Sequence, residues 1–159
     1  MGAKGESLAK QFEAKVSEAT AVIERLSDAD WKKVTAAEKW SVGVTAHHIA
    51  SSHAGLSGLI KTLADGKPGP NIQMDMIHAG NAKHAQEFAG CTKAETLALH
   101  KQNAAAAAAT LRSINDADFD RSGTVLVGVP PMSAGQLAGG LLCSHIADHL
   151  GSIKATVGA

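Results

Sequence analysis

Apolar residues recur at helical spacing in four long stretches of the chain. In the first, one apolar residue appears every three or four positions: Leu8, Phe12, Val16, Ala19 and Ile23. This spacing predicts a helix from residue 6 to about 26 with one buried stripe. The connector that follows is polar and has room for a short turn around 30–33. The second helix is expected to begin at Ser41, a good N-cap residue, and to end at Asp65 before the segment GKPGP.

The second half of the chain shows two more helical regions. The third helix is predicted in two pieces, from 71 to 88 and from 92 to 114, with a break at Gly90; the capping-box pattern Thr92-Lys-Ala-Glu95 opens the second piece. Residues 115–132 are expected to form a loop in which TVLVGV could be extended. The fourth helix opens with the capping box Ser133-Ala-Gly-Gln136 and runs to about 157. Four long helices with two long connections predict an all-α protein, a four-helix bundle that forms one domain from 1 to 159.

Composition narrows the classes of partner. Lys plus Arg and Asp plus Glu number 15 each, so the net charge is zero, which argues against nucleic acid as the partner. The sequence has no apolar run of membrane-spanning length, and MGAKGESLAK lacks the apolar core of a signal peptide. We therefore expect a cytoplasmic protein without a membrane partner. Two cysteines outside any CxxC pattern fit a reducing compartment. Eight histidines beside no tyrosine raise the question of a metal.

The last helix contains a histidine pair suited to a metal ion. His145 and His149 are four residues apart, which places both imidazoles on one helix face with about 6 Å between their β-carbons. The second helix offers a third ligand in the doublet His47-His48. His48 shares a face with Ser52 and Leu56, whereas His47 lies on a face of small residues that could equally be buried. Periodicity favours His48 without excluding His47.

These motifs resemble those of the DinB-like superfamily, which includes thiol-dependent transferases and the mycothiol-dependent maleylpyruvate isomerase. The resemblance rests on Trp40-Ser41-Val42 with a histidine eight residues after the tryptophan, and on the HxxxH pair and following glycine of the last helix. It implies an up-up-down-down bundle, often a homodimer, with a divalent metal held by His48, His145 and His149. Zinc or nickel is the expected ion.

Three departures from the family pattern weaken any inference about the substrate from the resemblance. Val44 stands where relatives usually have glutamate, so Ser41 has no capping-box partner. Asp148 stands where a histidine is common, and Ser152 replaces a frequent glutamine. All three expected ligands are nevertheless present. Asp148, next to His149, is a candidate acceptor for an imidazole N–H, although a solvated aspartate is equally compatible with its position.

The remaining polar residues have simpler expected roles. Asp75, His78 and Asn81 lie three apart and share a helix face; if that face points into the bundle, Asp75 or His78 could shuttle protons near the metal. We expect His53, His84 and His100 on solvated helix faces. Cys143 lies about 160° around the helix from His145 and cannot join the ligand set, so it is expected to be a small buried side chain.

Three functions are compatible with the residues and the resemblance. Three neutral imidazoles leave open coordination positions and the full charge of the ion, which acidifies a bound thiol. The predicted function is a metal-dependent low-molecular-weight-thiol S-transferase or isomerase acting on an electrophilic small molecule. The alternative is a non-catalytic metal-binding stress-response protein, and a metal-free ligand-binding bundle also fits. A ferritin-like di-iron site is excluded because no glutamate has a histidine three residues later.

Overall fold

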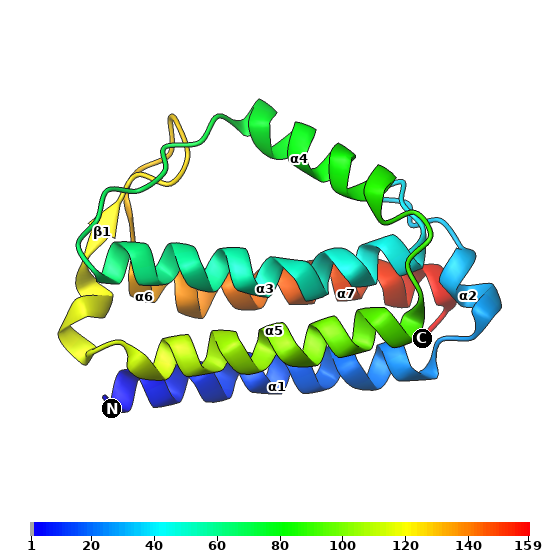
Figure 1. Cartoon of the computed structure of the whole chain (residues 1–159), viewed down its shortest axis with the longest axis horizontal. Coiled ribbons are helices and arrows are strands. Elements are labelled where there is room, and N and C mark those ends of the chain that lie inside the picture. The colour runs from blue at the N-terminus through cyan, green and yellow to red at the C-terminus, as the bar shows by residue number, and fades with distance from the viewer. Residues whose placement is uncertain (1) are drawn as a thin grey trace.

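Four long helices lie side by side in the computed structural model, which describes residues 2–159 (Figure 1). They are α1 (Ala3–Arg25), α3 (Val42–Ala64), α5 (Lys93–Ser113) and a last helix made of three joined parts. Those parts are α6 (Ala134–Gln136), the π-helical segment η2 (Leu137–Leu141) and α7 (Leu142–Val157). The predicted all-α four-helix bundle is confirmed.

The directions of the four helices differ from the predicted order. α1 and α7 run one way and α3 and α5 the other (Figure 1), which is up, down, down, up rather than up-up-down-down. A salt bridge of 2.7 Å between Lys154 and Glu18 joins the later parts of α1 and α7. Trp31 Nε1 donates to the Cys91 carbonyl at 2.9 Å, which ties the chain before α3 to the chain before α5. The long connection between α3 and α5 returns the chain to the end of the bundle where α3 begins, so these two helices are parallel.

The helix starts follow the predicted capping residues. Ser41 Oγ accepts a hydrogen bond from the Val44 backbone N–H at 3.1 Å and begins α3. The predicted capping boxes at the starts of α5 and α6 are both present. The short helix α2 (Asp28–Lys32) lies where a turn was expected. Local side-chain chemistry therefore determines these boundaries.

The start of α1 depends on a contact that is distant in sequence. The helix begins at Ala3, earlier than predicted, because the Asp116 carboxylate accepts from the backbone N–H groups of Ala3 (3.2 Å) and Lys4 (2.9 Å). Asp116 belongs to the 3₁₀ helix η1 (Asp116–Asp120), and it lies 112 residues away from Lys4 in sequence. A carboxylate is a favourable partner for the unsatisfied donors of a helix N-terminus.

The core lies between the four helices and holds aliphatic, alanine and phenylalanine side chains. Its largest fully buried apolar members are Phe12, Phe119, Ile23, Ile49, Ile60, Leu63, Leu111, Leu137, Leu142, Ile146 and Ile153. On α5 the core is built from small residues, since Ala107 is fully buried and Ala104 and Ala108 nearly so. Of the stripe predicted on α1, Phe12 and Ile23 are fully buried. Helix α4 (Met74–Glu87) has no buried residue and arches over α3 (Figure 1).

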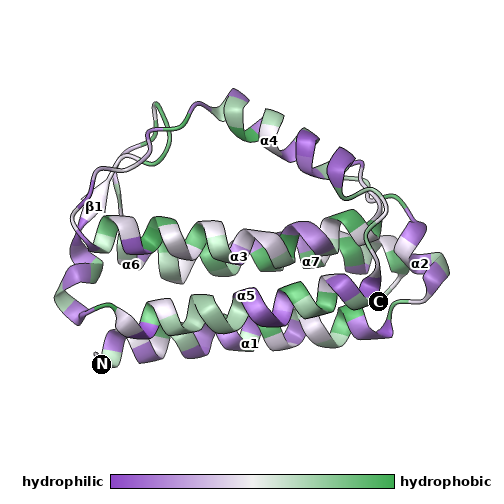
Figure 2. Ribbon diagram, viewed as in Figure 1, coloured by the Kyte–Doolittle hydropathy of each residue, from purple (hydrophilic) through white to green (hydrophobic). Residues whose placement is uncertain are grey.

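The connection between α5 and α6 is mostly irregular. Its two short strands, β1 (Ser122–Gly123) and β2 (Met132–Ser133), pair antiparallel with Ser122 opposite Ser133. The predicted extended segment 124–129 does not itself form a strand; within it, Leu126 makes an isolated bridge to Ile72. Figure 2 shows that the C-terminal half of α4 is mostly hydrophilic. Within residues 2–159, no helix is long and apolar enough to cross a membrane.

Candidate metal centre

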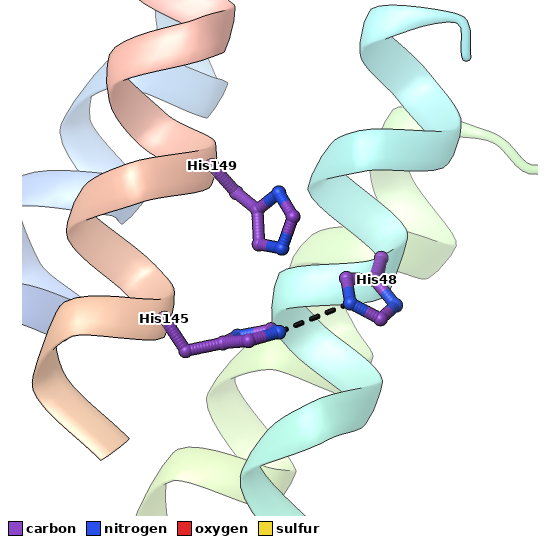
Figure 3. A group of neighbouring side chains, drawn as sticks. All are labelled: His48, His145 and His149. Carbon is purple, nitrogen blue, oxygen red and sulfur yellow. Dashed lines mark hydrogen bonds between the residues drawn. The ribbon is translucent and has the colours of Figure 1, made fainter. Parts of the chain in front are cut away.

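Three imidazoles converge between the helices α3 and α7. His48 projects from α3 toward His145 and His149 on α7 (Figure 3). The Nε2 atoms of His48 and His145 are 3.0 Å apart, and the three residues each offer a ligand nitrogen within 4.8 Å of the others. The ring centroid of His48 is 4.9 Å from that of each partner, and those of His145 and His149 are 4.6 Å apart. The sequence-predicted set is thus brought together.

The geometry and protonation of this group suit a divalent ion. Metal–nitrogen bonds of about 2.0–2.1 Å place two neighbouring ligand nitrogens roughly 2.9–3.4 Å apart, and the observed 3.0 Å falls in this range. Burial, followed by the neighbouring imidazoles, lowers the pKa of His48 to about 3. Burial and His149 lower the pKa of His145 to about 4. Both rings are therefore neutral at pH 7 and keep a lone pair for an ion.

Glu38 orients one of the three imidazoles. Its Oε1 accepts a hydrogen bond from His149 Nδ1 at 2.8 Å, and its Oε2 accepts from Ser152 Oγ at 2.6 Å. Burial acts to raise the pKa of Glu38, but hydrogen bonds led by those from Ser152 and His149 outweigh it and lower the pKa. An ionised carboxylate only accepts, so His149 Nδ1 carries a proton and Nε2 is the nitrogen of this ring that is available to an ion.

Glu38 takes the role for which Asp148 was one candidate, and Asp148 fits the other alternative left open for it, a solvated aspartate. Asp148 is exposed on α7 and makes no hydrogen bond to an imidazole within the described chain. Asp148 lies beside the ligand face rather than on it, about 100° around the helix from His149 and about 60° from His145. Glu38 comes from the connector before α3, 111 residues from His149. Glu38 was not singled out from the sequence; its position two residues before Trp40 is the signal that could have found it.

The His47-His48 doublet divides between two sites. His48 packs edge-on against Trp40 at a centroid distance of 5.3 Å, which restrains the ring beside the centre. His47 turns away and is 6% exposed. Its Nδ1 lies 3.2 Å from His84 Nε2, and its ring stacks on Phe88 at 4.0 Å. His47 therefore attaches the end of α4 to the bundle, whereas His48 belongs to the candidate metal centre.

Three histidines predicted on solvated faces lie elsewhere. His53 and His100 are each 1% exposed, and His53 Nε2 lies 3.0 Å from His100 Nδ1. His100 Nε2 completes the pair by a 3.3 Å contact with the Val16 carbonyl. His84 is half-buried against His47. The prediction was wrong for His53 and His100 because α3 and α5 are enclosed on several sides, so these two residues enter the core as a hydrogen-bonded pair. It was wrong for His84 because this side chain on α4 contacts His47.

A cavity of about 730 Å³ opens beside the three histidines. Its walls come from α3, α4, α7 and the loops around residues 68–72 and 125–126. Helix α4 contributes Ile77 and Asn81. Asp75 and His78, the predicted proton-shuttling candidates, are exposed and are not among the lining residues. Ile77 and Asn81 define the inward face of α4, and His78 lies about 100° from Ile77 around that helix.

The fold and this histidine group together define a helical bundle with a candidate metal centre between its second and fourth long helices. The model of the DinB superfamily matches residues 11–153. The chain therefore belongs to the DinB superfamily, as its motifs predicted.

Solved structures support the same fold assignment. A mycothiol-dependent maleylpyruvate isomerase and a histidine-to-alanine mutant of that enzyme each superpose with a TM-score of 0.73 at 12% identity, covering 94% of this chain and 60% of that one. YfiT from Bacillus subtilis, described as a probable metal-dependent hydrolase with an unusual four-helix bundle topology, has a TM-score of 0.69 at 19% identity. That match covers 98% of this chain and 86% of YfiT. No curated protein matches the chain.

Proposed function

We propose that this protein is a metal-dependent S-transferase or isomerase that uses a low-molecular-weight thiol and an electrophilic small molecule. His48, His145 and His149 would hold one divalent ion, with zinc or nickel as the expected metal. Bound there, the ion would supply a Lewis-acidic centre that lowers the pKa of a thiol. A homodimer stays a prediction from the family resemblance.

The observation that carries the proposal is the position of the histidines at a cavity wall. All three line the cavity of about 730 Å³, which is in the size range of small-molecule sites. A protein that only sequesters metal needs no such space beside its ligands. The cavity therefore favours catalysis over the non-catalytic alternative.

The chain's own residues would prepare the site for this reaction. Glu38 keeps the His149 proton on Nδ1 through its 2.8 Å hydrogen bond. Trp40 restrains the ring of His48 from the side. Asn81 lines the cavity from α4 and has amide groups that can donate to and accept from a substrate. The apolar walls would replace water around part of a bound electrophile.

The metal assignment is tested by elemental analysis of the purified protein beside His48→Ala and His145→Ala. We expect about one equivalent of metal in the wild type and a loss of about tenfold or more in metal affinity for each variant. His78→Ala, at an exposed position, is the matched control and should retain the metal. Undiminished metal in both ligand variants would remove the central proposal.

The reaction is tested separately by screening several thiols with monobromobimane as the electrophile. We expect thiol transfer by metal-loaded protein, a loss of activity when a chelator removes the metal, and recovery when the metal is restored. Full activity in the metal-stripped protein would contradict the proposed role of the ion. Metal binding without transfer for any thiol would instead support the non-catalytic alternative.

A further inference from the structure

The cavity beside the three histidines is elongated along α3. One face of this helix lines it from His48 through Ser52, Gly55, Leu56 and Leu59 to Thr62. Fourteen residues separate the first from the last, which corresponds to about 21 Å along the helix axis. The histidines stand at one end of this length. A ligand that fills the cavity must therefore be longer than its reactive group alone.

The wall away from the histidines is apolar. Ile72, Val125 and Leu126 come from the two loops at that end, and Ile77 comes from α4. The bridge between Ile72 and Leu126 holds the two loops together. Leu141 completes the lining from the last helix, where it is 36% exposed. An alkyl or aromatic group placed here would bury apolar surface that water otherwise covers, and this burial favours binding.

Away from the three histidines, the described part of the chain places no charged side chain in this cavity that could neutralise a charged ligand. Among the described residues, none that line it is Lys, Arg, Asp or Glu. The two lining hydroxyls are committed as donors, because Ser52 Oγ donates to the His48 carbonyl at 2.7 Å and Thr62 Oγ1 donates to the Gly58 carbonyl at 2.9 Å. A carboxylate or phosphate in the apolar part, beside Ile72, Val125 and Leu126, would be buried without a partner, which strongly disfavours its binding.

We propose that the cavity binds an elongated, uncharged and mainly apolar substrate, with its reactive end at the three histidines and its apolar body along α3 toward Thr62. The chemical class is a neutral electrophile that carries an alkyl or aromatic group. The position of the reactive end rests on the proposed function. The choice of a neutral, apolar body rests only on the lining.

Gly55 and Gly58 provide a matched pair of variants for the test. A β-carbon at either position would meet no heavy atom within 4 Å, and both residues lie on the same helix. Gly55 lines the cavity and Gly58 does not. Gly55→Leu should therefore fill part of the cavity, whereas Gly58→Leu adds the same side chain outside it.

Two fluorescent probes separate charge from shape. N-phenyl-1-naphthylamine is neutral, and 1-anilinonaphthalene-8-sulfonate has the same aromatic skeleton with one added sulfonate. We expect the wild type to bind the neutral probe at least about tenfold more tightly, since the sulfonate would be buried without a partner. Gly55→Leu should weaken neutral-probe binding by about tenfold or more through lost space, and Gly58→Leu by less than about twofold.

A charge-introducing variant keeps the inference testable if Gly55→Leu does not fold. Leu141→Lys introduces a cation into the lining at a partly exposed position, so it should raise the affinity for the sulfonate probe and lower the preference for the neutral one. Equal or tighter binding of the sulfonate by wild type would overturn the inference. So would an unchanged affinity in Gly55→Leu or an equal loss in Gly58→Leu.

Each titration is run on metal-loaded and on metal-stripped protein, which keeps this inference distinct from the proposed function. Selective binding of the neutral probe in both forms supports the inference even if elemental analysis rejects the metal site. Loss of selectivity in a protein that still holds its metal rejects the inference and leaves the metal proposal standing.

Discussion

Replacing Glu38 with glutamine tests how the candidate metal centre is oriented. The carboxylate accepts from His149 Nδ1 at 2.8 Å and from Ser152 Oγ at 2.6 Å. Glutamine keeps one acceptor oxygen and places an NH₂ group where the second oxygen was. If that NH₂ faces His149, it favours the tautomer with its proton on Nε2, the nitrogen needed for the ion. If it faces Ser152, the serine must turn its own donor away.

The expected loss follows from the role of such partners at metal sites. Removing the residue that orients a ligating histidine typically lowers metal affinity by about 10–100-fold, or roughly 1.4–2.8 kcal/mol. The side chain of Glu38 is only 10% exposed, so water replaces its hydrogen bonds poorly. We therefore expect a loss within this range for Glu38→Gln.

Asp148→Asn is the matched control for this prediction. It removes the same charge beside the same histidine, but Asp148 is exposed and makes no hydrogen bond to the ring. Competition for zinc against a chromogenic chelator at pH 7 measures both affinities. Wild-type affinity in Glu38→Gln, or an equal loss in Asp148→Asn, would refute the reasoning, because long-range charge rather than the hydrogen bond would then control the site.

Two further predictions concern stability. Burial, followed by the charge of His100, lowers the pKa of His53 to about 3 in the folded protein. The contribution of neutral His53 to the free energy of unfolding is therefore complete above its unfolded pKa of about 6.5 and is lost as the pH falls toward 3. We expect His53 to lower the free energy of unfolding by about 2 kcal/mol between pH 6.5 and 5. In urea unfolding, the free energy of unfolding of His53→Gln should therefore depend less steeply on pH than that of the wild type. An identical dependence in both proteins would contradict this prediction. Gly43→Ala would place a β-carbon 2.4 Å from Trp31 Nε1 and should destabilise the fold by about 1–3 kcal/mol. Gly58→Ala is the control in the same unfolding assay: its β-carbon would meet nothing within 4 Å, so it should stabilise the fold by up to about 1 kcal/mol. A Gly43→Ala protein as stable as Gly58→Ala would contradict the predicted clash.

Local patterns in the sequence determined the helices and the spacing of the histidines. Ser41, Thr92 and Ser133 begin helices through bonds to residues three positions later, and such contacts require no knowledge of the fold. The i,i+4 spacing of His145 and His149 likewise follows from helix geometry alone. These features could be predicted because both partners lie within about one helical turn.

Contacts between distant segments were decided only by the tertiary structure. Asp148 is the sequence neighbour of His149, yet the hydrogen bond from His149 Nδ1 goes to Glu38 in the connector before α3. Periodicity favoured His48 without excluding His47, and the stacking of His47 on Phe88 at the end of α4 separates the two histidines. His53 and His100 are polar residues that are stable in the core because each offers the other a hydrogen bond. Helix periodicity shows which residues share a face, but the partner that covers that face depends on the direction and order in which the helices pack.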